Sequence, residues 1–118
     1  MHHMKVGRDG EARAAGFLRK KGFRIREQDY RVPFAQIDII AEDDGTIVFV
    51  EVKTRRNLSF GLPQESVTRK KQEKLIRAAE WYLASNQLTE RECRFDVLTV
   101  YRPGEKAEEI NLIKNAFS

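Results

Sequence analysis

Two apolar runs joined by a tight-turn sequence constrain the fold more than any other feature of this chain. The runs cover residues 37–41 and 47–52, and Asp43-Asp44-Gly45 lies between them. Aspartate and glycine tolerate the left-handed backbone that a two-residue turn requires, so this spacing predicts a β-hairpin. The second run is rich in valine and almost wholly apolar, which is typical of a strand in the centre of a sheet.

Hydrophobic periodicity predicts the remaining elements of a small mixed α/β domain. We expect helices at residues 8–21 and about 64–86, a loop at 57–63, and strands at 23–32, 37–41, 47–53, 94–101 and 109–113. The polar alternation of the first strand suits the edge of a sheet, and Pro33 ends it. The order is α-β-β-β-α-β-β, with helices packed against a central sheet.

The composition excludes several classes of protein. The chain has 118 residues, 41% of them hydrophobic, which is enough for one core. No apolar run approaches the roughly 20 residues of a membrane helix, and the polar N-terminal stretch predicts no secretory signal. Cys93 is the single cysteine, expected to be buried, and the two histidines lie in the opening Met-His-His-Met. We therefore expect a cytoplasmic protein without a disulfide framework or a histidine-based metal site.

The charges are segregated along the chain. The net charge is +4, but residues 35–52 carry five acidic side chains and no basic one, while residues 53–77 carry eight basic and two acidic ones. Basic surfaces attract the phosphates of nucleic acids, whereas clustered carboxylates repel them unless a cation lies between. A mixed, well-solvated surface explains the same numbers, so charge supports a polyanion partner without deciding it.

The two apolar runs also contain an acid–acid–lysine set. Glu51 and Lys53 point to the same face of their strand, and the hairpin brings Asp38 to the neighbouring strand. Two adjacent carboxylates are readily reconciled by Mg²⁺, which takes carboxylate oxygens, water and a substrate phosphate as ligands. A nearby lysine can orient the attacking water or neutralise the phosphate. A simple salt bridge of Glu51 with Lys53 or Arg55 explains the spacing equally well.

Residues on both predicted helices extend this candidate site. Glu11 shares a helix face with Ala15 and Leu18, and Gln72 begins the stripe of Ile76, Ala79 and Leu83. A polar group on an inward stripe needs hydrogen-bond partners, such as a carboxylate shell or a phosphate. The alternatives are a first-turn glutamate favoured by the helix dipole and a glutamine that reaches solvent.

Basic residues around the set are candidates for phosphate contacts. Arg55 and Arg56 directly follow the Glu51–Lys53 segment. The outer face of the second helix carries Lys70, Lys74, Arg77 and Trp81, which is either a phosphate-tracking stripe with an aromatic for stacking or a solvated basic face. We favour packing of Trp81 on a neighbouring loop or a second subunit.

At these residues the sequence resembles the YraN-like family of small bacterial proteins, within the PD-(D/E)xK or restriction-endonuclease-like nuclease superfamily. The likeness runs from about residue 7 to residue 117. It is carried by Gly10-Glu11, Ala14, Leu18, Arg31, Ile37-Asp38-Ile39-Ile40-Ala41, Phe49-Val50-Glu51-Val52-Lys53-Thr54-Arg55, Phe60-Gly61, Pro63, Val67, Lys71-Gln72, Ala79, Tyr82-Leu83, Arg94-Phe95-Asp96-Val97 and Asn115-Ala116-Phe117.

The resemblance implies a restriction-endonuclease-like α/β fold, with a central mixed sheet of four to five strands flanked by helices in the order α-β-β-β-α-β. Residues 7–118 would form a single nuclease-like domain, and residues 1–6 a disordered leader or tag remnant. Asp38 and Glu51 match the superfamily's metal-ligand acids, Lys53 its catalytic lysine, Glu11 the helix glutamate of the Holliday-junction-resolvase-like branch, and Gln72 a helix glutamine of some branches.

One departure from the family pattern lies just before Asp38. The family usually has Gly-Glu there, and this chain has Ala35-Gln36. The glycine's absence can change the backbone entering the strand, and the glutamate's absence removes a negative charge close to Asp38. Since the core acids remain, we do not interpret the change as inactivation.

These observations lead to three hypotheses of different kinds. In the first, the protein is a Mg²⁺- or Mn²⁺-dependent DNA endonuclease, acting on branched DNA in recombination or repair, and dimeric so that two strands are cut. Glu11, Asp38, Glu51 and the Val52 carbonyl would hold the metal, and Arg31, Arg55, Arg56, Lys70, Lys71 and Lys74 would contact DNA. In the second, a non-catalytic module binds nucleic acid or protein on the same scaffold. In the third, the acids and the lysine only form salt bridges.

Overall fold

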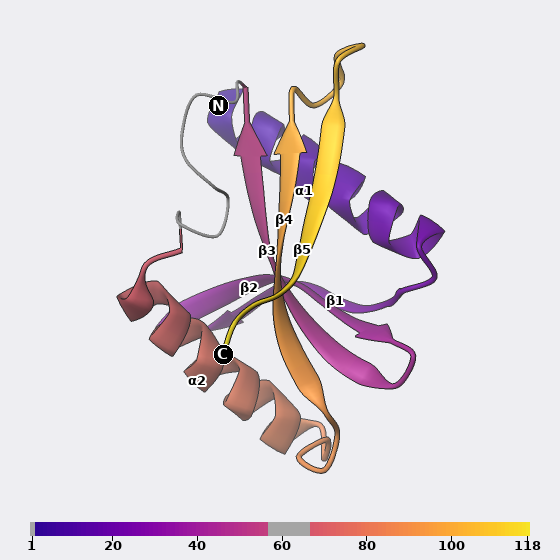
Figure 1. The fold of residues 1–118 in the computed structure, drawn as a ribbon. Coiled ribbons are helices and arrows are strands. Elements are labelled where there is room, and N and C mark those ends of the chain that lie inside the picture. Colours follow the sequence, from indigo (N-terminus) through magenta and orange to yellow (C-terminus); the bar gives the residue numbers. More distant parts are fainter. Residues whose placement is uncertain (1, 57–66) are drawn as a thin grey trace.

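The computed structural model describes residues 2–56 and 67–118, and the side chains of residues 10–56 and 67–118. Its elements are α1 (His2–Lys20), β1 (Arg24–Val32), β2 (Ala35–Asp43), β3 (Thr46–Arg55), α2 (Arg69–Ser85), β4 (Cys93–Tyr101) and β5 (Glu109–Phe117) (Figure 1). This confirms the order expected from periodicity. The predicted loop at residues 57–63 lies outside the described residues.

One mixed sheet contains all five described strands, in the order β1-β2-β3-β4-β5. Neighbours pair antiparallel except for β3 and β4, which are parallel because α2 lies between them in the chain. β3 is therefore central and β1 lies at an edge, as predicted. The architecture agrees with the restriction-endonuclease-like fold that the resemblance implies.

The β2–β3 turn has the predicted form. Asp43 pairs with Thr46, so the loop contains only Asp44 and Gly45. Their φ angles are 51° and 90°, and two successive left-handed residues are the signature of a type I′ turn. The turn fixes the register, which in turn decides which side chains of β2 and β3 face each other.

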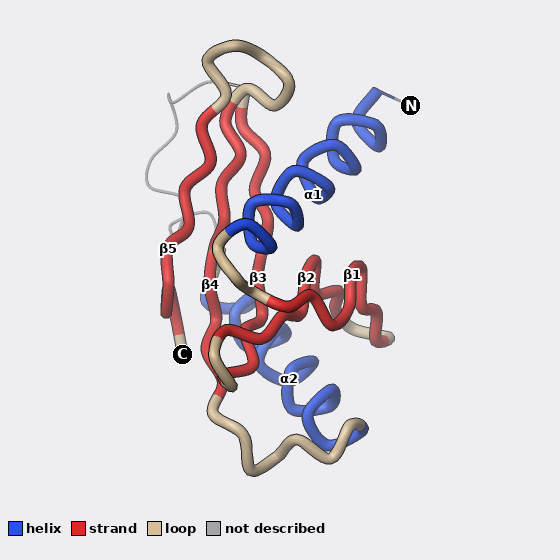
Figure 2. The backbone as a smooth tube through the Cα atoms, turned by 90° about the vertical axis from the view of Figure 1, so that its right-hand side faces the viewer, coloured by secondary structure: helices blue, strands red, loops and turns tan. Residues whose placement is uncertain are grey.

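Alternating residues of β3 contribute to two separate cores. Ile47 and Phe49 join the core under α2, whereas Val48 and Val50 join the core that contains Ala14, Ala15 and Leu18 of α1. A strand directs successive side chains to opposite faces, so the two helices cover opposite faces of the sheet. Figure 2 shows α1 and α2 as separate layers that do not pack on each other.

The β2–β3 pairing ends while both strands continue. It runs from Asp43↔Thr46 only to Ile39↔Val50, although β2 begins at Ala35 and β3 extends to Arg55. Beyond that point β2 remains paired with β1, and β3 with β4. We call this parting of β2 from β3 the fork. Figure 2 shows β1 and β2 running across the direction of β3, β4 and β5.

The starts of both helices and the exposure of Cys93 differ from the sequence expectation. α1 begins at His2 rather than residue 8, so its backbone runs through the segment assigned to a leader. α2 begins at Arg69, after the N-cap Thr68, rather than at about residue 64. Cys93 is exposed at the start of β4, so the prediction that it is buried was wrong. Neither described helix combines the length and the hydropathy that a membrane-spanning segment requires.

Candidate functional site

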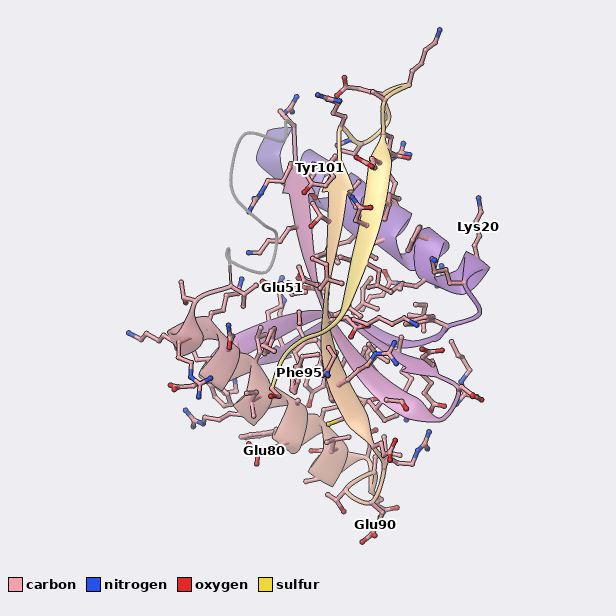
Figure 3. The ribbon with its side chains drawn as sticks, in the orientation of Figure 1. Lys20, Glu51, Glu80, Glu90, Phe95 and Tyr101 are labelled. Carbon is pink, nitrogen blue, oxygen red and sulfur yellow. The ribbon has the colours of Figure 1, made fainter. Side chains whose placement is uncertain are left out.

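Asp38 and Glu51 lie at the fork, where backbone pairing between their strands has just ended. Continuing the register one step beyond Ile39↔Val50 sets Asp38 opposite Glu51. The Asp38 Oδ2 accepts the backbone N–H of Val52 at 2.8 Å, a donor that no longer meets a β2 carbonyl. Glu51 is only 5% exposed, near the middle of the molecule (Figure 3). The sequence prediction that these carboxylates lie together is consistent with this geometry.

The surroundings of Asp38 disfavour its charged form. Burial, followed by the negative charge of Glu51, raises the pKa of Asp38 to about 8. The Val52 N–H opposes this rise without cancelling it. The charged form of Asp38 is therefore disfavoured at neutral pH. Such crowding is what a cation between the carboxylates would relieve.

Two lysines neutralise Glu51. Lys53 Nζ lies 3.4 Å from Glu51 Oε2, and Lys71 Nζ, from the first turn of α2, forms a closer ion pair with the same oxygen. Burial lowers the pKa of Lys53, with the neighbouring charge of Lys71 adding to this, while Glu51 opposes it. For Lys71 burial also favours the neutral form, but the bond to Glu51 outweighs it and raises the pKa.

Glu11 reaches the pair from α1. Gly10 permits the approach, since a Cβ at this buried position would collide with the Thr54 hydroxyl of β3. Burial, followed by the charge of Asp29, raises the pKa of Glu11, and interactions with Asp38 and Arg31 lower it. Glu11 therefore lies within interaction distance of both Asp38 and the end of β1.

The donor set fits a small hard cation bound by two carboxylates. Within residues 2–56 and 67–118, no three carboxylate, imidazole or thiolate groups converge closely enough to hold a metal ion. Mg²⁺ needs only one or two carboxylates when water and substrate phosphates complete its octahedron. Asp38 and Glu51 would meet that requirement, and Glu11 interacts with Asp38 from the α1 side.

The remaining candidates lie at different distances from the pair. Arg55 and the exposed Arg56 follow Lys53 at the far end of β3; four residues along a strand separate Arg55 from Glu51 by roughly 13 Å. Lys70 and Lys74 line a hollow beside the start of α2, which Lys71 also borders. Arg31 is 70% exposed on its side chain and pairs with Asp29 at 3.2 Å.

Gln72 does not join the carboxylates. Its Nε2 donates to the Val67 carbonyl at 2.9 Å, which satisfies one backbone acceptor near the start of α2. The buried stripe of α2 is Leu75, Ala78, Ala79 and Tyr82, one position away from the stripe expected from the sequence. Lys71 precedes Leu75 by four residues, so it faces inward in the position expected for Gln72. Lys71 lies four residues before Leu75 and eleven before Tyr82, so helical spacing from these two buried residues would have identified it from the sequence.

Fold and site together define the class of this protein. It is a restriction-endonuclease-like α/β protein with a five-stranded mixed sheet and two helices, and it carries two carboxylates and two lysines where β2 and β3 part.

The family follows from comparison with known sequences. A family model described as "Uncharacterised protein family UPF0102" matches residues 10–100, and the chain belongs to this family, which confirms the YraN-like resemblance. A UPF0102 protein of Syntrophotalea carbinolica is 47% identical, over 89% of this chain and 85% of its own length. Those of Caldicellulosiruptor saccharolyticus and Moorella thermoacetica are 44% and 45% identical, over 99% of this chain and 100% and 98% of theirs.

Proposed function

We propose that this protein is a divalent-cation-dependent endonuclease that hydrolyses phosphodiester bonds in DNA. The observation that supports the proposal is the pair of half-buried Asp38 and buried Glu51 at the fork, with Lys53 beside it. Burial and the neighbouring charge of Glu51 disfavour the charged form of Asp38, and such perturbed groups concentrate at functional sites. Two adjacent carboxylates repel each other, so a purely structural role gives no reason to place both of them here.

Each residue has a chemical role in this proposal. Asp38 and Glu51 would hold Mg²⁺ or Mn²⁺, with the Val52 carbonyl as a further oxygen ligand. Such a cation, when bound, makes water more acidic and stabilises the charge developing on phosphate. Lys53, with a pKa lowered by burial, would orient the attacking water or neutralise the phosphate. Glu11 would accept hydrogen bonds from water on the α1 side.

The basic side chains define where the DNA backbone would run. Arg55 and Arg56 continue β3 beyond the pair, and Lys70, Lys71 and Lys74 border it on α2. Substrate phosphates on these cations would lie on both sides of the cut bond. Branched, junction-like DNA is the substrate we propose, by analogy with resolvases, and a symmetric dimer would cut both strands.

A cleavage assay tests the proposed function. The folded protein is incubated with labelled four-way-junction DNA and a matched linear duplex in Mn²⁺, Mg²⁺ or EDTA, beside Glu51→Gln and Lys53→Gln. We expect metal-dependent cleavage that falls by about 10²–10³-fold in each variant, the usual loss when a charge-stabilising group is removed. The ratio of junction to linear cleavage ranks the substrates.

Glu80→Gln is the matched control, because Glu80 lies on the exposed side of α2 (Figure 3) and its removal changes the charge identically. Melting curves with and without Mg²⁺ give a second readout, since a bound cation raises the melting temperature by mass action. Cleavage that persists undiminished in Glu51→Gln would show that the pair is not the active site.

A second candidate is a non-catalytic module that binds nucleic acid on the same scaffold. The observation that favours it is the pairing of Glu51 with two lysines, Lys53 and Lys71. It predicts salt-sensitive DNA binding that is equal in EDTA and Mg²⁺ and unchanged in Glu51→Gln. A folded protein that cuts none of these DNAs but binds them in this way would replace the first proposal by this one.

A further inference from the structure

A hollow lies directly beside the candidate metal site, between the start of α2 and the turn that joins β1 to β2. Its volume is about 410 Å³, within the roughly 300–1,000 Å³ typical of small-molecule sites. Its lining comprises Phe34, Ala35, Thr68, Lys70, Lys71, Lys74 and Leu75. Lys71 belongs both to this lining and to the ion pair with Glu51, so the hollow and the carboxylate pair share a side chain.

The wall formed by α2 is strongly cationic. Lys70 and Lys74 are exposed, and neither forms an ion pair with any carboxylate of the described residues. Their positive charges are therefore available to a ligand, unlike those of Arg69, which pairs with Glu73, or Lys71. None of the described residues that line the hollow is acidic. By charge complementarity we expect the hollow to bind an anion. The anionic group of the proposed substrate is phosphate.

The side formed by the β1–β2 turn carries an aromatic ring, and a second ring packs against it outside the lining. Phe34 lines the hollow, the Arg77 guanidinium lies 4.4 Å from its ring centre, and Trp81 contacts its edge with ring centres 6.3 Å apart. Trp81 is 52% exposed, so its packing on the β1–β2 turn leaves half of it open. Aromatic rings with adjacent cations are the platforms on which unpaired bases stack.

We propose that this hollow holds an unpaired nucleotide of the substrate, its phosphate on Lys70 and Lys74 and its base against Phe34, the ring on which Trp81 packs. The proposal rests on the nuclease function proposed above and specifies its substrate class: branched DNA with at least one unpaired nucleotide next to the bond that is cut. A base inside a duplex is already stacked and paired, so it cannot present a face to the aromatic wall.

Trp81 provides the readout, because it is the single tryptophan of the chain. In EDTA, where no metal-dependent cleavage occurs, the protein is titrated with a single-stranded oligothymidylate, a blunt duplex, and the same duplex with a three-nucleotide overhang. A base stacked near the indole quenches its fluorescence. We expect saturable quenching by the single strand and by the overhang duplex, and none by the blunt duplex at equal phosphate concentration.

The double variant Lys70→Gln with Lys74→Gln tests the phosphate contacts. Loss of two contacts should weaken single-strand binding and reduce the slope of log affinity against log salt by about 1.4, at about 0.7 per contact. The matched control is Lys20→Gln with Lys106→Gln, two exposed lysines away from the hollow; Figure 3 labels Lys20 at the end of α1. The two double variants have the same net charge, so the general electrostatic attraction of the protein for DNA falls equally in both.

The outcomes separate the two proposals. Quenching by blunt duplex as strong as by single strand would overturn the preference for unpaired nucleotides. An equal loss of affinity in both double variants, or no quenching by any of the three DNAs, would overturn the hollow as a site. If the protein cuts no DNA but its fluorescence is still quenched in a way that depends on Lys70 and Lys74, only the nuclease function is refuted. If the protein cuts DNA but shows no such quenching, only the hollow is refuted as a nucleotide site.

Discussion

Asp38 is the residue at which stability and proposed function oppose each other. Its carboxyl group is held by the Val52 N–H on one side and crowded by Glu51 on the other. Because its pKa in the folded chain is about 8 against an ordinary value near 4, the folded state retains a proton that the unfolded state has already lost. The stabilisation from this proton is complete below the ordinary pKa and is lost as pH rises through about 8.

Asp38→Asn should therefore stabilise the protein in EDTA by an amount that grows with pH. Asparagine keeps the shape of the protonated acid, can accept the Val52 N–H and donate to Glu51, and does not titrate. We expect the melting temperature of the variant to exceed that of the wild type by an increasing margin between pH 4 and pH 9. A margin that is constant over this range would contradict the raised pKa.

Residues on strands were easier to predict at the site than residues on helices. Asp38, Glu51 and Lys53 followed from the two-residue periodicity and from one turn, because a strand has only two faces. On α2 a shift of one position rotates a side chain by about 100°, and the apolar residues from Leu75 to Leu83 cover a wide arc. The sequence therefore favoured Gln72, whereas tertiary packing turns Lys71 toward Glu51.

At the scale of elements, the start of α2 departs from the usual charge pattern of helices. Its first three residues are Arg69, Lys70 and Lys71, and its first turn contains no acid. The N-terminal end of a helix carries a partial positive charge, so cations there are unfavourable by about 0.3–1 kcal/mol each at exposed positions. A local rule broken in this way is expected where function requires the charge.

Lys70→Glu should consequently stabilise the fold while weakening oligonucleotide binding. A carboxylate at this position interacts favourably with the helix dipole, so the free energy of unfolding should rise by about 0.5–1 kcal/mol, as measured by urea denaturation at low salt. Lys20→Glu places a negative charge in the last turn of α1, where the helix dipole is negative, and should lower the free energy of unfolding by a similar amount. A loss of stability in Lys70→Glu would show that the lysine has a structural role.

The elements themselves were largely predictable, and their ends were not. In the sequence the strands are apolar runs bounded by Pro33, Gly45 and Gly104. Each of these three residues lies in a turn of the structure. The start of α2 at Arg69 depends on the Thr68 hydroxyl, which accepts the Lys71 N–H at 3.2 Å. The sequence offers several competing polar residues before it, so periodicity alone extended the helix too far.

At the scale of the whole molecule, two acidic residues at the end of β2 connect elements that are distant in the chain. Glu42 binds Arg24 and Arg26 of β1 and Arg91 of the segment before β4, at 3.0, 2.5 and 3.2 Å. Burial raises the pKa of Glu42, but the bonds from Arg26 and Arg24 outweigh it, and the pKa lies below its usual value. Its neighbour Asp43 behaves likewise, because Arg94 lowers the pKa of that carboxyl.

These lowered pKa values predict acid lability. A group with a depressed folded pKa contributes stability above its ordinary pKa, near 4, and that stability is lost as pH falls through the lower folded value. Glu42→Gln should begin less stable at pH 6 and lose less on acidification, so that its urea midpoint approaches the wild-type midpoint by pH 3. Glu90→Gln, at an exposed position before β4 (Figure 3), should leave the profile unchanged. Parallel profiles for Glu42→Gln and wild type would refute the prediction.

The fork has a consequence for biosynthesis. Glu11, Asp38, Glu51 and Lys53 all leave the ribosome before α2 and β4, yet β3 needs β4 as its parallel partner and Glu51 needs Lys71 as its counter-charge. Parallel pairing requires the whole crossover to be synthesised first. A nascent chain that ends before β4 therefore carries the acids without the framework that aligns them. The candidate site is therefore assembled only after α2 and β4 have been synthesised.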